Sequence, residues 1–361
     1  MRHLVRTMAT ATRTIAKPPM SGCESSGWIL LSLNGPLDTP ALRISAVPDP
    51  TFSWARPASL VAASGKRVVI VGGTGGLGRE LALASSDAGA DVTVVGRSFR
   101  DGPASKIKFI KADLESMKEA SRVGAELSSA PWDIVVLTTG IISAPKREAT
   151  AEGLERDLAI SYLSRLAILD VLAPRLAETP TPSRVFVMGF PGAGEAGMLG
   201  DLNAEKGPYE QFKVYVYMAS HCYLGYQLDL SFPSVACRHM NSVAGNEALV
   251  LSMQRHFSPR VDFFGLNPGL VSTSIRANAL GGSKSWSFWA IESFLGLFTT
   301  SPAQYGAKTA PLLFAPELSG QGGRMFNQSG TAIRPSEVLS EERVEAILAE
   351  SRALLARALA T

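Results

Sequence analysis

Residues 67–97 decide the fold: RVVIV at 67–71, GGTGGLG at 72–78, RELALASSDAG at 79–89 and DVTVVGR at 91–97. The two β-branched runs predict short buried strands, and the segment between them predicts a helix. Glycines let the backbone approach a ligand closely at the start of that helix, where unpaired N–H groups favour a phosphate. A strand, glycine turn, helix and strand in this order therefore predict a dinucleotide site, with a plain glycine-rich turn as the alternative.

The same alternation continues along the chain. Apolar runs predict strands at 107–114, 132–140, 183–190 and 261–269. Helical patterns lie between them at 115–129, 151–177 and 239–256. Alternating strands and helices predict a single α/β domain, a doubly wound parallel sheet of the Rossmann type, with its ligand at the carboxyl ends of the strands. We place this domain at 65–340 and a C-terminal helix at 341–361.

Residues 1–64 differ from the rest and predict an irregular N-terminal extension or linker. Residues 1–23 contain no acidic side chain and four basic ones, Arg2, Arg6, Arg13 and Lys17. Such a composition is typical of a mitochondrial transit peptide, although a disordered tail or a start codon placed too far upstream would look the same. We therefore expect a cytoplasmic protein, or a mitochondrial one if residues 1–23 are a transit peptide.

The composition argues against several classes of function. The chain has 361 residues, with 35 basic and 32 acidic side chains and a net charge of +3, which does not indicate a nucleic-acid-binding protein. Three cysteines without a CxxC pattern indicate neither a disulfide scaffold nor a metal site. No apolar run reaches the roughly 18 residues that a membrane-spanning helix needs.

The end of the second predicted strand indicates which dinucleotide is bound. A protein that uses NAD would place Asp or Glu here to hold the ribose hydroxyls. This strand ends Gly96-Arg97-Ser98, with no acidic residue before Asp101. Arginine matches a 2′-phosphate with a planar, charge-assisted fork, so Arg97 predicts NADP, and Arg79 could contribute. The alternative is that Arg97 is a solvated loop residue.

The glycines and three downstream motifs together resemble the short-chain dehydrogenase/reductase family over roughly residues 66–340. Gly73, Gly75 and Gly78 fit the general GxGxxG pattern, whereas Gly72, Gly76 and Gly78 fit the GxxxGxG pattern of that family. The downstream matches are Asp113-Leu114, Thr138-Thr139-Gly140 and Pro268-Gly269-Leu270-Val271-Ser272-Thr273. The resemblance implies cofactor contacts at Gly72, Gly76, Leu77, Gly78, Arg97, Asp113, Thr139, Gly140, Val271 and Thr273.

The catalytic set that the resemblance implies is a Tyr that moves a proton, a Lys four residues later and a Ser that positions the carbonyl. The strand expected to end in Ser-Ser instead ends Met188-Gly189-Phe190-Pro191. A YxxxK pattern occurs at Tyr209 and Lys213. The helix before the Pro-Gly strand gives another register, with His239 at the Tyr position and Val243 at the Lys position.

A third register puts Tyr215 and Ala219 in those places, and no register supplies both Tyr and Lys at the start of the helix that leads into the Pro-Gly strand. Residues 214–237 have three interpretations: an insertion, translated non-coding sequence, or an ordinary helix packed on the core. We keep Tyr209, Lys213 and His239 as the candidate catalytic residues. A helix cap or surface role is the alternative for His239, and Ser143 is a further candidate that a helix cap would also explain.

The segment 274–306 stands where the family resemblance implies a lid over the substrate. It contains WSFWAIESFLGLF at 286–298, with a hinge at Gly281-Gly282. An apolar lid predicts a small hydrophobic substrate, while a contact in a homo-oligomer or a membrane-surface patch are alternatives. Residues 239–251 and 263–276 also resemble accessory reductases of fungal secondary-metabolite pathways. The sequence thus predicts an NADP(H)-dependent oxidoreductase, or an inactive dinucleotide-binding protein of the same fold.

Overall fold

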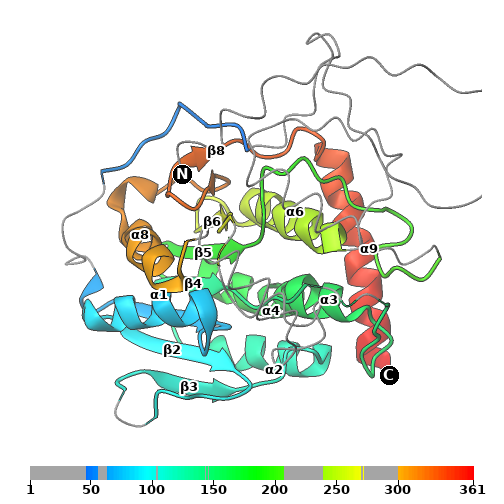
Figure 1. Ribbon diagram of the computed structural model, residues 1–361, viewed down its shortest axis with the longest axis horizontal. Helices are drawn as coiled ribbons and strands as arrows, with labels where there is room; N and C mark the ends of the chain where they lie inside the picture. Colours follow the sequence, from blue (N-terminus) through cyan, green and yellow to red (C-terminus); the bar gives the residue numbers. More distant parts are fainter. Residues whose placement is uncertain are drawn as a thin grey trace, which may run out of the picture. The chain divides into compact units, whose positions relative to one another are not determined.

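Eight strands form one sheet, in the order β3-β2-β1-β4-β5-β6-β7-β8, in the computed structural model (Figure 1). The structure describes residues 46–55, 63–102, 105–142, 144, 146–206, 239–269, 271 and 300–361. All strands are parallel except β8, which pairs antiparallel with β7. The strands are β1 (Arg67–Val71), β2 (Asp91–Gly96), β3 (Lys108–Lys111), β4 (Ile134–Leu137), β5 (Ser183–Met188), β6 (Val261–Leu266), β7 (Met325–Phe326) and β8 (Ala332–Ile333).

Helices cover both faces of the sheet, because successive residues of a strand point to opposite faces. Val68 and Ile70 of β1 pack with the pair formed by α1 and α8, which lie side by side in Figure 1. Val69 and Val71 pack with the helices of the opposite face. In chain order the helical elements are α1 (Gly76–Asp87), α2 (Met117–Leu127), α3 (Arg156–Leu158), the π-helical turn η2 (Ala159–Leu163), α4 (Ser164–Ala177), α6 (His239–Phe257), α8 (Pro302–Phe314), the 3₁₀ turn η4 (Pro316–Leu318) and α9 (Glu341–Ala360).

The order in which the chain adds strands to the sheet reverses between β1 and β4. These two strands are neighbours, although β2 and β3 come between them in sequence. The chain leaves β1 toward β2 on one side and returns to β4 on the other. In open α/β sheets, ligands bind in the crevice beyond the carboxyl ends of the strands at such a reversal. The predicted doubly wound sheet is confirmed, and its geometry puts the site at the ends of β1 and β4.

Part of the N-terminal extension, residues 46–55, is bound to the α/β domain. Residues 46–55 do not form a free linker, since Asp49 N donates to Ala332 O at 2.9 Å and Arg324 pairs with Asp49 at 2.6 Å. The indole of Trp54 also donates to Gly330 O at 2.7 Å. The short strand β8 provides the partner that the sequence did not reveal. The possible transit segment, residues 1–23, lies outside the described residues.

Two other predicted boundaries move. The helix expected over 151–177 begins only at Arg156 and contains the π-helical turn η2. Residues 302–306, expected to end the lid, belong to α8, whose Ser301 and Gln304 form a capping box and whose Tyr305 is buried. Residues 274–299 of that lid and the whole of 214–237 lie outside the described residues.

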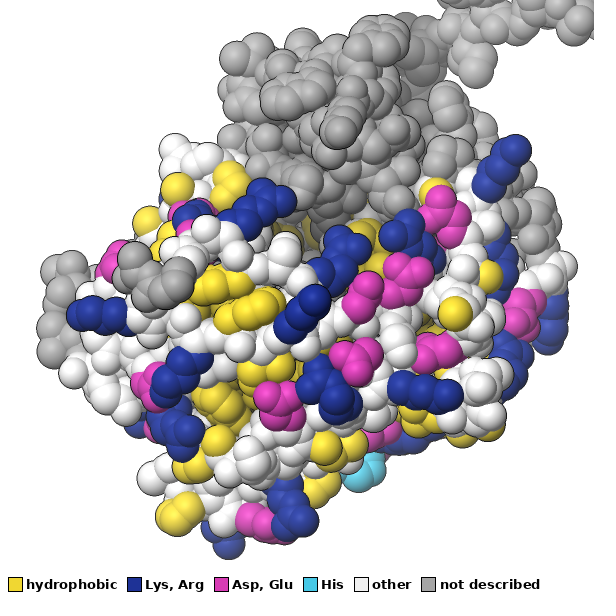
Figure 2. Space-filling model, turned by 90° about the horizontal axis from the view of Figure 1, so that it is seen from below, with side chains coloured by type: hydrophobic (Ala, Val, Ile, Leu, Met, Phe, Trp, Pro, Cys, Tyr) yellow, Lys and Arg dark blue, Asp and Glu magenta, His cyan; other side chains and the backbone are white. Residues whose placement is uncertain are grey.

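The surface shown in Figure 2 mixes basic and acidic side chains, with hydrophobic ones between them. This face carries no large area of one sign of charge. Among the helices that the structure describes, none combines the length and apolar character needed to cross a membrane.

Candidate functional site

A cavity of about 740 Å³ opens at the carboxyl ends of β1, β2, β4, β5 and β6. Its lining comes from the loop after β1, from the turns that follow other strands, from α3, η2 and the start of α4, and from the first two turns of α6. Ten of the predicted site residues lie in the described part of the chain and line this cavity: Gly72, Gly76, Leu77, Gly78, Arg97, Asp113, Thr139, Gly140, Val271 and His239. Tyr209, Lys213 and Thr273 lie outside the described residues, as does Ser143.

The glycine loop needs glycine for steric reasons. Gly72 has φ +88°, and this positive φ turns the chain sharply at the end of β1. Its N–H donates to Val95 O of β2 at 2.8 Å. A Cβ on Gly72 would lie 2.7 Å from Thr138 Oγ1, and one on Gly78 would lie 2.5 Å from the carbonyl oxygen of Gly72. The loop therefore packs tightly against the turn after β4, and no larger residue fits at either position.

The start of α1 faces the cavity without a capping side chain. Gly75 is the N-cap residue in an extended conformation, and no side chain bonds to the first turn. A Cβ on Gly75 would meet no protein atom within 4 Å, in contrast to Gly72 and Gly78. A helix N-terminus with uncapped N–H groups attracts an anion through these groups and the helix dipole. This arrangement fits a pyrophosphate.

The arginines near the end of β2 have different partners. Arg79 of α1 forms ion pairs with Asp101 and with Glu80, and the hydrogen bonds that its guanidinium donates to Asp101 raise the pKa of Arg79 above its ordinary value. Arg79 is thus already paired with a carboxylate, and its contribution to a phosphate site stays a prediction. Arg97 is exposed and lines the cavity, and it has no hydrogen-bond or ion-pair partner among the described residues.

Thr139, after β4, presents a polar atom without a partner. Thr139 Oγ1 is buried, and no described residue hydrogen-bonds to it. Its neighbour Thr138 is different, since Thr138 Oγ1 donates to Val71 O at 3.0 Å. A buried hydroxyl that lines a cavity without a partner is costly unless a ligand or water completes it. Nearby, the carboxylate of Asp113 is exposed at the cavity and accepts only the backbone N–H of Glu115, at 3.2 Å, among the described residues.

His239, the first described residue of α6, is held by a buried carboxylate. Its Nδ1 lies 2.6 Å from Asp157 Oδ2, and the side chains of His239 and Asp157 are 12% and 0% exposed. Burial disfavours the charged imidazolium, but the negative charges of Asp157, Glu155 and Glu195 more than offset this, so the pKa of His239 lies above its ordinary value. A histidine poised in this way can donate and accept a proton.

Asp157 is itself fixed by the π-helical turn η2. Ser161 donates to Asp157 Oδ1 at 2.6 Å, and the same hydroxyl accepts the backbone N–H of Ile141 at 3.0 Å. The turn η2 connects α3 to α4, and such π-helical turns are frequent at functional sites. The carboxylate is thus tied both to its own helix and to the segment that follows β4.

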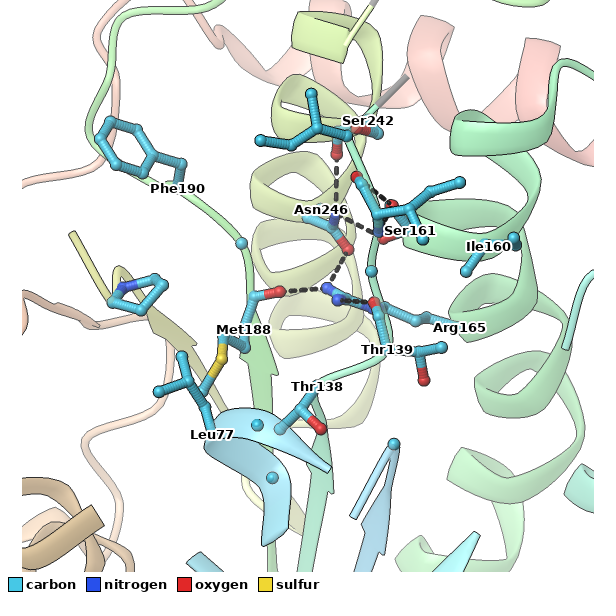
Figure 3. A pocket seen from close by; sticks show the side chains of 18 of the residues that line it. Leu77, Thr138, Thr139, Ile160, Ser161, Arg165, Met188, Phe190, Ser242 and Asn246 are labelled. Atoms are coloured by element: carbon cyan, nitrogen blue, oxygen red, sulfur yellow. Dashed lines mark hydrogen bonds between the residues drawn. The ribbon is translucent and has the colours of Figure 1, made fainter. Parts of the chain in front are cut away.

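A buried arginine forms the floor of the cavity (Figure 3). Arg165 of α4 donates to Asn246 Oδ1 at 2.7 Å and also to the backbone oxygens of Met188 and Thr139. Asn246 in turn donates to the backbone oxygens of Ser161 and Ser242, at 2.9 and 2.7 Å. Burial of the guanidinium lowers the pKa of Arg165 to about 9. The arrangement joins the ends of β4 and β5 to α6.

An apolar wall lies beside His239. Met240, Val243 and Ala193 form a small cluster, against which Phe190 packs. Each of the four also lines the cavity. Val243, at the position where the family resemblance implies a Lys, therefore brings a hydrocarbon surface instead of a charge. Of the described residues, no group of His, Cys, Asp and Glu could hold a metal ion.

Sequence reasoning missed Asp157, Ser161, Arg165 and Asn246. A usable signal was present: Asp157, Ser161 and Arg165 are spaced four apart within the apolar segment DLAISYLSRLAIL, so they share one helix face. Polar side chains at this spacing in an otherwise apolar helix indicate a buried polar network. The apolar pattern by itself predicts only a helix here.

Comparison with known proteins adds relatives to this geometry. No protein-family model matches the chain. An uncharacterized oxidoreductase from Saccharomyces cerevisiae is 37% identical over 320 residues, which is 86% of this chain and 95% of the relative. A short-chain dehydrogenase/reductase from Penicillium roqueforti is 23% identical over 273 residues, 72% of each chain.

Solved structures share the fold. A 3-oxoacyl-(acyl-carrier-protein) reductase from Agrobacterium tumefaciens, solved with NADP bound, has a TM-score of 0.51 and 17% identity. The match covers 74% of this chain and 94% of the reductase. At that identity the likeness concerns the arrangement of strands and helices, which agrees with the sheet described above.

Proposed function

Because this chain belongs to the short-chain dehydrogenase/reductase family of oxidoreductases, we propose that it uses NADP(H) to reduce a carbonyl group, or to oxidise an alcohol, on a small hydrophobic molecule. The observation that carries the proposal is the uncapped start of α1 at Gly75, which opens onto the cavity. Its neighbours Gly72 and Gly78 leave no room for a side chain between the loop and the turn after β4.

The residues present fit the cofactor along its length. The first turn of α1 would hold the pyrophosphate, and Arg97 would hold the 2′-phosphate. Asp113 would contact the adenine, and Thr139, whose buried hydroxyl has no partner among the described residues, would contact the nicotinamide half together with Gly140 and Val271. When bound, the reduced cofactor supplies a hydride to a carbonyl carbon. The chain must then supply a proton to the carbonyl oxygen.

His239 is our candidate for the group that moves this proton. It lines the cavity at the start of α6, beside the apolar wall of Phe190, Ala193, Met240 and Val243. This wall supports a hydrophobic substrate, because ligand pockets use apolar surface for affinity and a few polar groups for orientation. Tyr209 and Lys213 stay candidate catalytic residues. A role in a secondary-metabolite pathway also stays a proposal.

Binding of the two nicotinamide dinucleotides tests the proposal directly. We expect NADPH to bind more tightly than NADH in a fluorescence titration. Arg97→Gln should weaken NADPH by about 10–100-fold, the equivalent of about 1.5–3 kcal/mol for a hydrogen bond to a charged group, and leave NADH unchanged. Arg100→Gln is the matched control, since Arg100 is exposed nearby but does not line the cavity.

A dinucleotide-binding protein without turnover is the second candidate. It is favoured by the end of β5, where Met188-Gly189-Phe190-Pro191 offers no hydroxyl to position a carbonyl. A Cβ on Gly189 would lie 3.1 Å from Asn246 Cβ, so a serine there would crowd α6. Loss of absorbance at about 340 nm when NADPH is mixed with a panel of aromatic ketones identifies the enzyme. Tight NADPH binding without this loss would identify the inactive protein.

A further inference from the structure

Asp157 is a buried carboxylate that the proposed reaction does not yet use. Its side chain has no exposed area, and Asp157 does not line the cavity itself. Both carboxylate oxygens nevertheless have partners, with Oδ2 2.6 Å from His239 Nδ1 and Oδ1 2.6 Å from the Ser161 hydroxyl. An ionisable group buried at the edge of a cavity and aimed at a histidine is a functional candidate.

We propose that Asp157 is the positioning residue that makes His239 the proton donor and acceptor of this site. Asp157 occupies Nδ1 of the imidazole, so that the proton exchanged with the substrate oxygen is the one on Nε2. The inference rests on the proposed function, because it needs a reaction in which the chain supplies a proton. It is an alternative to the expectation that a tyrosine and a lysine four residues apart share this task.

The geometry restricts rotation of both side chains. The hydroxyl of Ser161 bonds to Asp157 Oδ1 and to the backbone of Ile141, so the carboxylate is anchored to the segment after β4. The imidazole is bonded at Nδ1 and lines the cavity, and Nε2 has no partner among the described residues. A carboxylate on one ring nitrogen fixes which nitrogen exchanges its proton and stabilises the imidazolium.

The charges around His239 favour its protonated form. Asp157 and Glu155 reach it from the α3 region, and Glu195 reaches it from the loop after β5. The positive charge of Arg165 also interacts with the Asp157 carboxylate. With three acidic side chains near the ring, the imidazolium persists to higher pH than in a free histidine.

The proton transfer balances without any further reactant. In the reductive direction the Nε2–H bond breaks as an O–H bond forms on the carbonyl oxygen, which leaves neutral imidazole. The imidazole then regains a proton from solvent. In the oxidative direction neutral Nε2 accepts the alcohol proton. Reduction therefore needs the charged ring, and oxidation needs the neutral one.

Two measurements on the full chain test the inference. The first is an NMR titration of the histidine Cε1–H signals, assigned with His239→Gln, in the protein without cofactor. Asp157→Asn should lower the pKa of His239 by about 1–3 pH units, because it removes the adjacent negative charge. The second is the pH dependence of kcat/KM for ketone reduction, whose high-pH fall should move to lower pH by the same amount.

Matched variants separate positioning from general damage. Asp170→Asn removes a carboxylate on α4 that pairs with Arg352, and it should change neither measurement. Ser161→Ala removes one of the two side-chain bonds to Asp157 and should give an intermediate effect. If Asp157→Asn fails to fold, Ser161→Ala and His239→Gln carry the test. His239→Gln should lower kcat by about 10²–10⁴-fold, the usual contribution of general acid–base catalysis.

The possible results distinguish the inference from the proposed function. Turnover that survives in His239→Gln with an unchanged pH profile overturns the inference and leaves the proposed function standing. A His239 titration that is the same in wild type, Ser161→Ala and Asp157→Asn also overturns it. NADPH binding without turnover in the wild-type protein overturns both together.

Discussion

Arg165 donates a hydrogen bond to Asn246 Oδ1 at 2.7 Å, although 81 residues separate the two in sequence. This contact joins α4 to α6 beneath the cavity, and the same guanidinium bonds to the backbone at the ends of β4 and β5 (Figure 3). One side chain of α4 therefore holds α6 and the ends of β4 and β5 together at the site. The position of His239 on α6 depends on this connection.

We expect Arg165→Met to lower the free energy of unfolding by about 2–4 kcal/mol. Methionine fills part of the space but leaves the Asn246 amide oxygen and two backbone oxygens without their donor, and each buried unsatisfied group costs about 1–3 kcal/mol. Urea unfolding followed by circular dichroism measures the change. Arg175→Met on the same helix is the control, because Arg175 is 61% exposed and its ion pair with Glu178 is a surface pair. Equal losses in the two variants would contradict the structural role of Arg165.

Most of the framework can be predicted from sequence because buried parallel strands have a strong local signature. The apolar runs predict six strands, and all six are present: β1 has the predicted ends and the other five are shorter than predicted. The strands β7 and β8 have two residues each, so no periodicity exists to reveal them. They form because β7 pairs with β6 and β8 bonds to the segment at residues 46–55, contacts that a local pattern does not reveal.

The site was harder to predict than the fold, because its contacts join distant parts of the chain. Asp157 and His239 are 82 residues apart, and nothing local links them. Arg79 shows the same limit: its place beside the last glycine predicts a phosphate contact, and nothing local reveals that Asp101 pairs with it. Arg97, by contrast, was recognised from its position at the end of a strand, where topology alone brings it to the cavity.

Gly75 and Gly78 should respond differently to alanine. Gly78→Ala would place a Cβ against Thr138 and Gly72, so we expect a loss of about 1–3 kcal/mol in stability. Gly75→Ala meets no protein atom within 4 Å and should keep the stability within about 0.5 kcal/mol. It should still weaken NADPH at least about tenfold, because the methyl group would occupy the space before the first turn of α1. Thermal unfolding and NADPH titration of both variants decide the matter, and unchanged affinity in Gly75→Ala would mean that the phosphates bind elsewhere.

Phe190→Ala should reduce kcat/KM for an aromatic ketone by about 10–100-fold, since burying a phenyl ring contributes about 1.5–3 kcal/mol. The kcat/KM for a small polar carbonyl compound should fall much less, because such a substrate does not reach the apolar wall. Phe99→Ala is the matched control, as Phe99 stacks on Phe109 and does not line the cavity. Steady-state kinetics with both substrates measure the ratio. If kcat/KM falls by the same factor for both substrates, Phe190 supports the fold and does not select the substrate.

The pairing of His239 with Asp157 should make stability depend on pH, independently of any reaction. The pKa of His239 is raised above its unfolded value near 6.5, so its contribution to stability is fully present below that pH. The contribution is lost as the pH rises through the folded-state pKa, where the native protein releases a proton that it holds more tightly than the unfolded chain. A double-mutant cycle of His239→Gln and Asp157→Asn, measured by urea unfolding at pH 6 and pH 9, isolates the pair. We expect a coupling energy at pH 6 that exceeds the value at pH 9 by more than the scatter of about 0.5 kcal/mol that independent sites show. A coupling that is the same at both values of pH would mean that the contact in the native protein joins neutral imidazole to the carboxylate throughout this range.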